Sequence, residues 1–392
     1  MNLVDAKIAL VHDWFLKNSM GGAEKVTLFI DKLLNKNYSQ PDLFALASNI
    51  EESKTNIFQN RIIKKSIIES FPFGKTKVQN YLPLLPFAIE QIDVSQYDLV
   101  ISSSHAFAKG IITSPEQLHI SYIHTPMRYA WDQMNTYLEQ SKLSNFGFKI
   151  PIRYALYKLR QWDFLSSQRV DYLISNSNFT AKRIRKYWGL TSEVIHPPVD
   201  IKRFNFKNTR EDFYLSVNRL VPNKRIDLLI NSFNKLNLPL IVIGDGPERS
   251  KLEKMANTNI KFLKQVSNLE VENYMSRCRA FVYAGLEDFG IAPIEAMASG
   301  APVIGYGKGG ILDTVICFNE SNKKDFSNGI LFKNQTISDI VDTIDWFEDK
   351  KIWKEFNPQD LNNYSERFSP EVFKTKFDFF INKVWQEFKI KL

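Results

Sequence analysis

The stretch Glu287-Asp288-Phe289-Gly290-Ile291-Ala292-Pro293-Ile294-Glu295 says more about the fold and function of this chain than any other segment. It carries a carboxylate at each end, with a glycine and a proline between them. The apolar run Ala280–Tyr283 upstream predicts a short buried strand, so Glu287 should lie in the loop beyond the carboxyl end of that strand. Pro293 suits the first turn of a following helix, and Gly300 suits the end of that helix.

This order of strand, loop and helix favours a binding site for a phosphate ester rich in hydroxyl groups. Ligands of open α/β sheets bind beyond the carboxyl ends of the strands. A helix N-terminus at that edge offers backbone amides and a positive dipole end to phosphate, while carboxylates accept hydrogen bonds from hydroxyls. The stretch therefore predicts a sugar-nucleotide site, although two glutamates at this spacing also fit an ordinary acidic surface loop.

The stretch closely resembles the Glu-x7-Glu motif of retaining GT-B glycosyltransferases of family 4. The resemblance implies two doubly wound, Rossmann-like α/β domains that face each other across a cleft, with a C-terminal helix crossing back to the first domain. It also implies that Glu287 holds the hydroxyls of the donor sugar and Glu295 the nucleotide ribose. The amides of Phe289, Gly290 and Ile291 would then assist in binding the diphosphate.

Length and composition agree with a two-domain globular protein. The chain has 392 residues, 44% of them hydrophobic and 24% charged, and a net charge of +8 that favours anionic partners without identifying them. We find no apolar run long enough to span a membrane and no signal-peptide layout at the N-terminus. Cys278 and Cys317 lie in apolar sequence and suggest reduced core residues, so we expect a cytoplasmic protein.

Strand patterns alternate with helix patterns almost throughout, which predicts parallel sheets with crossover helices. We expect an acceptor-side domain at residues 1–200, a nucleotide-sugar domain at 201–369, and packing of 370–392 back on the first domain. The expected strands are Lys7–Val11, Asp42–Ala47, Tyr97–Ser103, His119–Ile123, Asp171–Ser175 and Glu193–His196, then Phe213–Val217, Leu240–Ile243, Ile260–Leu263, Ala280–Tyr283, Pro302–Gly305 and Gly329–Phe332. The expected helices include Ala23–Leu34, Arg153–Gln168, Phe179–Trp188 and Pro370–Lys389.

Two features of the first domain are candidates for the site. Gly21 and Gly22 follow the first strand and open a helix, where the backbone can approach an anion closely, although a glycine pair alone also fits a plain turn. His124 ends a strand, although out of context a structural histidine hydrogen-bonded to a neighbouring backbone is the simpler interpretation. The family resemblance implies that the glycine loop contacts the donor diphosphate and that His124 lies close to the transferred sugar. The other histidines, His12, His105, His119 and His196, show no metal-ligand spacing with it.

The second domain contributes cations and a further glycine pair. Arg219 and Lys224 flank a proline turn and could grip one polyanion, although a solvated basic loop is the alternative. In the family resembled, this Arg-x4-Lys pair binds the diphosphate. Gly244 and Gly246 invite a dinucleotide interpretation, but Arg249 stands where the third glycine of that motif belongs. The resemblance places this glycine pair at the nucleotide side instead.

The sequence contains no D-x-D pair of the kind that holds a divalent ion against a diphosphate. We therefore expect no metal and no cofactor, with the cations and helix amides neutralising the leaving group. Two segments, Arg61–Tyr81 and Phe146–Arg160, mix bases with large apolar residues and suggest peripheral contact with the inner face of the cytoplasmic membrane. Half-buried helices with solvated basic edges explain these segments almost as well.

The resemblance is closest to the bacterial O-antigen mannosyltransferase subgroup. It is carried by Ser102–Ala106, His124–Asp132, Pro197–Asp200 and Glu287–Gly290, and it departs at Ala284-Gly285-Leu286, where relatives often have a proline or another acid. It implies retaining transfer of mannose from GDP-mannose to a hydroxyl of a growing surface polysaccharide or polyprenyl-diphosphate-linked glycan. The alternatives are a UDP- or ADP-sugar donor and a catalytically silent nucleotide-sugar-binding scaffold. Nucleic acid is not an expected partner, because no compact basic stripe or known binding module is present.

Overall fold

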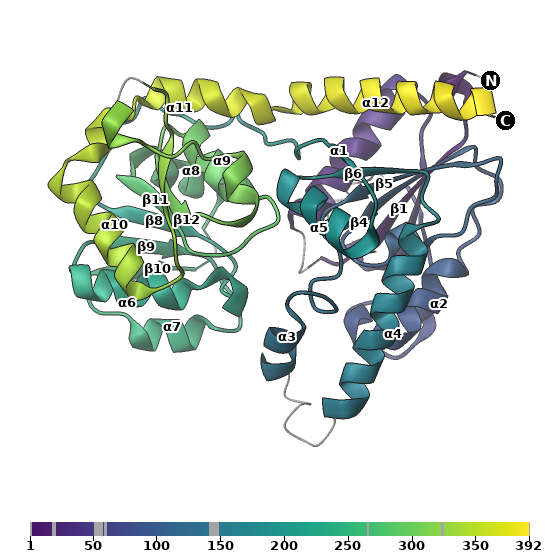
Figure 1. Cartoon of the computed structure of the whole chain (residues 1–392), viewed down its shortest axis with the longest axis horizontal. Coiled ribbons are helices and arrows are strands. Elements are labelled where there is room, and N and C mark those ends of the chain that lie inside the picture. The colour runs from purple at the N-terminus through teal and green to yellow at the C-terminus, as the bar shows by residue number, and fades with distance from the viewer. Residues whose placement is uncertain are drawn as a thin grey trace. The chain divides into compact units, whose positions relative to one another are not determined.

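The computed structural model describes residues 2–17, 21–50, 58, 61–140, 149–264, 266–322 and 325–391. These residues form two compact units, Met1–His196 together with Lys374–Leu392, and Pro197–Phe373 (Figure 1). Each unit is built on its own parallel β-sheet with crossover helices, as the alternating pattern predicted. Within the described part of the chain, no helix is both long and apolar enough to cross a membrane.

The described part of the first unit holds a seven-stranded parallel sheet in the order β3-β2-β1-β4-β5-β6-β7. Its central strands β1, β4 and β5 are entirely buried, as expected of a parallel sheet that is covered on both faces. The strand order reverses between β1 and β4, which is the topological switch point where ligands of doubly wound sheets bind. The strands are β1 (Ile8–Phe15), β2 (Asp42–Ser48), β3 (Ile63–Lys65), β4 (Leu99–Ser104), β5 (Leu118–Ile123), β6 (Tyr172–Ser175) and β7 (Glu193–Val194).

Local signals set the helix ends in this unit. The Ser177 hydroxyl accepts a hydrogen bond from the Thr180 amide at the start of α5, and Gly189 ends that helix with a φ of +72°. The helical segments are η1 (Leu3–Asp5), α1 (Gly22–Asn37), η3 (Ile67–Ser70), η4 (Val78–Leu84), α2 (Leu85–Glu90), η5 (Ala108–Gly110), α3 (Met134–Gln140), α4 (Lys149–Ser167) and α5 (Asn178–Trp188).

The last helix, α12 (Pro370–Lys391), belongs to the first unit from Lys374 onward. Its Asp378 accepts a hydrogen bond from Asn37 at 2.7 Å, and its Glu387 accepts one from Tyr172 at 3.0 Å. The buried side chains of Phe377, Ile381 and Trp385 pack on the same side of the helix. The expectation that the C-terminal helix crosses back to the first domain is therefore confirmed.

The second unit has a six-stranded parallel sheet among its described residues, in the order β10-β9-β8-β11-β12-β13, with the switch point between β8 and β11. Its strands are β8 (Tyr214–Val217), β9 (Leu240–Ile243), β10 (Ile260–Leu263), β11 (Ala280–Tyr283), β12 (Val303–Tyr306) and β13 (Gly329–Phe332). Its helical segments are η7 (Pro222–Lys224), α6 (Ile226–Leu236), α7 (Arg249–Met255), α8 (Asn268–Arg277), α9 (Ile291–Ala298), η8 (Gly309–Asp313), η9 (Glu320–Asn322), α10 (Ile337–Asp349), η10 (Ile352–Glu355), α11 (Pro358–Ser365) and η11 (Glu366–Phe368).

Three sequence expectations need correction. Strand β1 runs to Phe15 rather than ending at Val11, because the polar residues His12 and Asp13 are fully buried within it. Strand β3 was not predicted at all, since it lies inside the basic segment assigned to membrane contact. The prediction that Cys317 is a core residue is wrong: Cys278 is buried, but Cys317 is exposed because the turn after η8 carries it to the surface.

Candidate functional site

The loops that follow β8, β9, β11 and β12 meet at the carboxyl edge of the second sheet. The amide of Leu220, after β8, donates to the Asp245 carbonyl, after β9, at 2.9 Å. The amide of Gly310, after β12, donates to the Glu287 carbonyl, after β11, at 2.8 Å. These backbone hydrogen bonds fix the loops to one another, so side chains from several strands gather at one place.

The central contact of this edge is an ion pair between Lys224 and Glu287, which come from opposite sides of the β8–β11 switch point. Their side chains are 19% and 22% exposed, so the pair is reached from solvent but largely enclosed by protein. The Lys224 ammonium also lies 3.4 Å from the Tyr283 hydroxyl. The structure thus brings together a cation and a carboxylate that were both predicted to contact the donor.

Glu295 lies one turn into α9 and pairs with a residue that the sequence did not single out. Arg203 donates to Glu295 at 2.8 Å, and another of its nitrogens lies 3.4 Å from Glu272 on α8. Arg203 stands in the polar linker after the Pro197-Pro198 pair, where a lone arginine carries no motif. The carboxylate of Glu295 is therefore held in place by a guanidinium from a distant part of the unit.

Gly290 and the start of α9 provide the backbone groups of the predicted stretch. Gly290 caps the helix with a φ of +91°, a conformation that favours glycine, and Ile291 is the first helical residue. The ring of Phe289 is buried and packs against Phe368 with ring centroids 5.8 Å apart. Phe289 therefore contributes only its backbone to this edge, while its side chain belongs to the core.

Arg219 differs from its predicted partner Lys224. It follows β8, and its side chain is exposed, with no ion pair or side-chain hydrogen bond recorded among the described residues. The guanidinium is consequently available to an anion, whereas the Lys224 ammonium is already paired with Glu287. The two predicted cations occupy one loop but meet different environments.

Gly244 and Gly246 have a packing role that the sequence did not predict. A Cβ on Gly244 would lie 1.8 Å from the Asn218 carbonyl oxygen, and one on Gly246 would lie 2.3 Å from that of Leu220. These glycines therefore let the β9 loop press against the β8 loop that carries Arg219. Arg249, which occupies the third motif position, donates to the Gly244 carbonyl at 2.8 Å and holds the same turn.

A further glycine pair, Gly309 and Gly310 after β12, was missed. Gly309 has a φ of +87°, and a Cβ on Gly310 would lie 2.3 Å from the Asp288 carbonyl oxygen. Together with the bond from the Gly310 amide to Glu287, this close contact holds the loop that presents the Glu287 side chain. The signal was present in the sequence as Gly307-Lys308-Gly309-Gly310 directly after an expected strand.

In the first unit, a buried carboxylate spans the β1–β4 switch point. Asp13 in β1 accepts hydrogen bonds from the amides of the four residues 105–108, and His105 Nδ1 lies 3.1 Å from its Oδ2. Burial by itself raises the pKa of Asp13, but His105, His12 and the backbone amides outweigh it and lower that pKa below its usual value. The charged carboxylate therefore fixes His105, which is partly exposed at this edge.

His124, predicted to lie near the transferred sugar, belongs to the same region. Its Nε2 lies 2.8 Å from the Ser103 hydroxyl, which contacts the Thr27 hydroxyl at 2.7 Å, and Thr27 in turn lies 3.2 Å from His12 Nδ1. Burial, reinforced by neighbouring histidines, holds the pKa of His124 well below its ordinary value, and burial also lowers the pKa of His12. Both rings are therefore neutral near pH 7.

Gly21 and Gly22 open α1 just beyond β1. The Gly21 amide donates to the Glu24 carboxylate at 2.8 Å, and Gly22 is the first helical residue. Residues 18–20, which join this turn to β1, lie outside the described part of the chain. Across the described residues of both units, no group of three or more His, Cys, Asp and Glu side chains is arranged to hold a metal ion.

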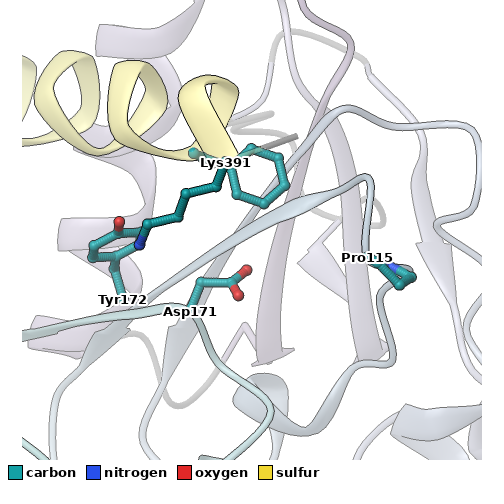
Figure 2. A pocket seen from close by; sticks show the side chains of 5 residues that line it. Pro115, Asp171, Tyr172 and Lys391 are labelled. Carbon is teal, nitrogen blue, oxygen red and sulfur yellow. The ribbon is translucent and has the colours of Figure 1, made fainter.

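A pocket of about 430 Å³ lies elsewhere, beside the C-terminal end of α12 (Figure 2). Asp171 and Tyr172 at the start of β6, together with Lys391, line it. The Asp171 carboxylate accepts a hydrogen bond from the His119 amide at 2.8 Å, and burial raises its pKa. Because the start of β6 is its amino end, this pocket is at the opposite sheet edge from His124 and Asp13 and is not part of the candidate site.

Two family models match the chain in succession. The model described as Glycosyltransferase Family 4 matches residues 20–203, and the one described as Glycosyl transferases group 1 matches residues 199–367. The second range contains Arg219, Lys224, Glu287 and Glu295, and the first contains Gly21, Gly22 and His124.

Two curated relatives with sequence similarity to this chain are named as mannosyltransferases. The chain is 25% identical over 266 residues to the alpha-1,3/1,6-mannosyltransferase ALG2 of Candida glabrata, covering 53% of this chain and 56% of that protein. It is 28% identical over 229 residues to the O-antigen chain mannosyltransferase RfbU of Salmonella typhimurium, covering 55% and 58%. Both matches thus span little more than half of the relatives' lengths.

The crystal structure of Anabaena Alr3699/HepE in complex with UDP has a TM-score of 0.67 and 14% identity to this chain. The superposition covers 96% of this chain and 100% of that one. At this identity the likeness shows the fold, which is GT-B.

Proposed function

Because this chain belongs to the glycosyltransferases of group 1 and family 4, we propose that it transfers a hexose from a nucleotide sugar to a hydroxyl group of a glycan. The donor in this proposal is GDP-mannose, and the product retains the configuration of the anomeric carbon. Two relatives named as mannosyltransferases support the choice of sugar. The acceptor is a growing surface polysaccharide or a polyprenyl-diphosphate-linked glycan.

The observation that carries the proposal is the contact between Lys224 and Glu287 at the switch point of the second sheet. A nucleotide sugar presents a diphosphate next to a ring of hydroxyls, so it suits a cation and a carboxylate that lie side by side. Lys224 and the exposed Arg219 would bind the diphosphate, with the amides at the start of α9 assisting. Glu287 would accept hydrogen bonds from the sugar, and Glu295 from the ribose.

The proposed chemistry needs no metal and no enzyme nucleophile. The bond from the anomeric carbon to the diphosphate oxygen breaks while the acceptor oxygen bonds to that carbon from the same face. The acceptor proton passes to the departing phosphate oxygen. Arg219 and Lys224 stabilise the negative charge that develops on the leaving diphosphate, which is the electrostatic contribution that typically dominates such steps.

The first unit would bind the acceptor. Gly21 and Gly22 place backbone amides at the start of α1, and the neutral ring of His124 can exchange hydrogen bonds with a sugar hydroxyl. A lipid-linked acceptor would bring the enzyme to the inner face of the cytoplasmic membrane, where it would work as a peripheral protein.

A UDP-sugar is the second candidate donor, because the structurally similar HepE protein was crystallised with UDP. Incubating the enzyme with GDP-mannose, UDP-glucose and ADP-glucose in the presence of a lipid-linked acceptor extract tests the choice directly. We expect GDP-mannose alone to give a labelled glycan, and NMR of that product should show a retained anomeric configuration. Transfer from UDP-glucose alone would replace the donor, and no transfer from any donor would favour a nucleotide-sugar-binding scaffold.

A further inference from the structure

Helix α4 of the first unit carries a stripe of large apolar side chains on its outer surface. Tyr154, Tyr157, Phe164 and Leu165 are exposed, with Tyr154 and Leu165 each 60% accessible. At roughly 100° per residue, these positions fall on one face of the helix. Soluble surfaces rarely expose so many large apolar groups together, so this stripe suggests a contact with something outside the chain.

Cations border the stripe on both sides. Arg153 and Lys158 are exposed, and the helical period places them at opposite margins of the aromatic face. The Lys158 ammonium lies 5.6 Å from the ring centroid of Tyr154 and 5.8 Å from that of Tyr157. The carboxylate of α4, Asp163, is buried, so among its described side chains the helix exposes positive charge without negative charge.

The inner face of α4 is already satisfied, so the stripe is not needed to complete the fold. Asp163 accepts hydrogen bonds from the buried Lys109 ammonium at 2.6 Å and from the indoles of Trp131 and Trp188 at 2.7 and 2.8 Å. The indole of Trp162 donates to Glu90 of α2 at 2.8 Å, and the two helices lie side by side in Figure 1. α4 is thus rigidly held with its aromatic face outward.

A second element of the same unit repeats this chemistry. Phe73 is 70% exposed and has a φ of +58°, a conformation that costs energy for a large side chain and is retained mainly at functional positions. The Lys77 ammonium lies 5.4 Å from its ring centroid. The turn is built to hold this shape, because a Cβ on Gly74 would lie 1.8 Å from the Ile68 carbonyl oxygen.

The two elements share one scaffold. Phe71 and Tyr81, which flank the Phe73 turn, join the same hydrophobic cluster as Leu156 and Leu159 on the inner face of α4. Their positions relative to each other are therefore fixed by a common core. The α4 stripe and the Phe73 turn are thus held by the same hydrophobic core of the first unit.

We propose that the α4 stripe and the Phe73 turn dock the first unit on a membrane that contains anionic lipids. Aromatic side chains insert at the level of the lipid headgroups, and flanking lysines and arginines bind the anionic surface. A bilayer fits better than a second copy of this chain, because two copies of a face with Arg153 and Lys158 would repel each other. The inference names the surface for the peripheral location in the proposed function and rests on that part of it alone.

Co-sedimentation of the full chain with vesicles tests this docking. We expect binding to vesicles of phosphatidylglycerol mixed with phosphatidylcholine, little binding to phosphatidylcholine alone, and weakening by salt. The double variant Tyr154→Ser/Tyr157→Ser should weaken binding roughly tenfold or more, through lost apolar burial. Arg153→Gln/Lys158→Gln should weaken it about 25-fold, since each cation near an anionic surface contributes about fivefold. Phe73→Asn, whose side chain tolerates positive φ, should weaken binding without straining the turn.

Matched controls separate docking from general stickiness and charge. Phe379 is a 71% exposed aromatic on α12, and Lys235 and Lys254 are exposed cations of the second unit. Phe379→Ser and Lys235→Gln/Lys254→Gln should leave binding unchanged, and all variants should keep the parent melting temperature. Absence of vesicle binding, equal effects of the controls, or self-association that the tyrosine variant abolishes would each overturn the proposal. Because the assay uses no donor sugar, its result is independent of the transfer assay.

Discussion

Lys224 and Glu287 form an ion pair across the switch point of the second sheet, with each side chain only about one-fifth exposed. Each charge in the pair compensates the other, because an unpaired charge that is partly shielded from water destabilises the folded protein. A bound diphosphate could replace Glu287 as the ion-pair partner of the Lys224 ammonium. The Glu287 carboxylate would then be available to accept hydrogen bonds from the hydroxyls of the sugar. The same contact thus prepares both groups for the donor.

Removing either member should abolish most transfer while leaving the fold intact. Lys224→Ala and Glu287→Gln each remove a contact to the charge distribution of the transition state, which typically costs roughly 100- to 1,000-fold in rate. Initial rates with saturating donor measure the effect, and thermal melting checks the fold. Lys202→Ala, which breaks the exposed pair with Glu371, is the matched control and should retain parent activity. Folded Lys224 or Glu287 variants that keep more than about half of the activity would contradict these roles.

Arg203 should act as a positioning residue through Glu295, to which it donates at 2.8 Å. Loss of a charged hydrogen bond of this kind corresponds to roughly a tenfold or greater change in affinity. We expect Arg203→Ala to raise the donor KM with a smaller change in kcat, and Arg203→Lys to restore part of the loss because it keeps the charge. Arg277→Ala, which breaks a solvent-accessible pair with Glu211, serves as the control. An unchanged KM in Arg203→Ala would remove this arginine from the donor site.

Transfer should persist in excess EDTA. The reason is that Arg219, Lys224 and the helix amides of α9 supply positive charge in a sequence without a D-x-D pair. Product formation with and without the chelator, at equal ionic strength, measures the effect. Activity that is lost with EDTA and restored by magnesium or manganese would show that an ion performs the task assigned to these cations.

GDP should stabilise the protein more than UDP at the same concentration. A ligand that binds only the folded state raises the melting temperature in proportion to its affinity and concentration. Neither Glu287 nor Glu295 distinguishes the base, so the expectation comes from the mannosyltransferase relatives rather than from these carboxylates. Melting curves with both nucleotides, with calorimetry for their dissociation constants, decide the matter. A larger shift with UDP would exclude GDP-mannose as the preferred donor.

Stability should fall as the pH drops below about 6.5. Burial lowers the pKa values of His12 and His124 from the ordinary 6.5, and lowers that of His119 to about 3. Below pH 6.5 the unfolded chain therefore binds protons that the folded chain does not. The stabilisation that the buried neutral histidines contribute is complete above that pH and declines below it. Each histidine contributes a slope of up to about 1.4 kcal/mol per pH unit.

Urea unfolding at several pH values between about 7 and 5 measures this slope. His119→Gln keeps a polar side chain beside Ser102, which contacts His119 at 2.8 Å, and removes one titrating group. We expect the variant to show a shallower decline in unfolding free energy than the parent protein. A slope identical to that of the parent would contradict the burial-shifted pKa of His119.

Much of the fold could be predicted because parallel sheets demand continuous apolar strands. Leu240–Ile243 and Ala280–Tyr283 were predicted with their observed bounds, since nothing polar interrupts them. β1 was cut short because His12 and Asp13 look like loop residues in a sequence. In the structure Asp13 accepts hydrogen bonds from the loop after β4, and His12 Nδ1 contacts the Ser103 carbonyl of β4 at 2.7 Å. β3 was not predicted because a three-residue strand in a basic segment is too short to show an alternation of apolar and polar residues.

The candidate site could be predicted where one segment holds all its parts, as in the stretch from Glu287 to Glu295. Arg203 and Asp13 could not, because each acts through a partner 92 residues away in the chain, Glu295 and His105 respectively. Such pairs depend on sheet order rather than on local spacing.

The first unit is discontinuous, since it comprises Met1–His196 and the segment from Lys374 onward, whereas the second unit is one uninterrupted stretch. During synthesis the first unit therefore cannot be completed until residues 197–373 have been synthesised and its last helix has followed them out of the ribosome. At typical elongation rates this delay lasts roughly 10 to 35 s. Through that interval the surface that later receives Phe377, Ile381 and Trp385 is uncovered, so a nascent chain is most exposed to chaperones or misassembly at that place.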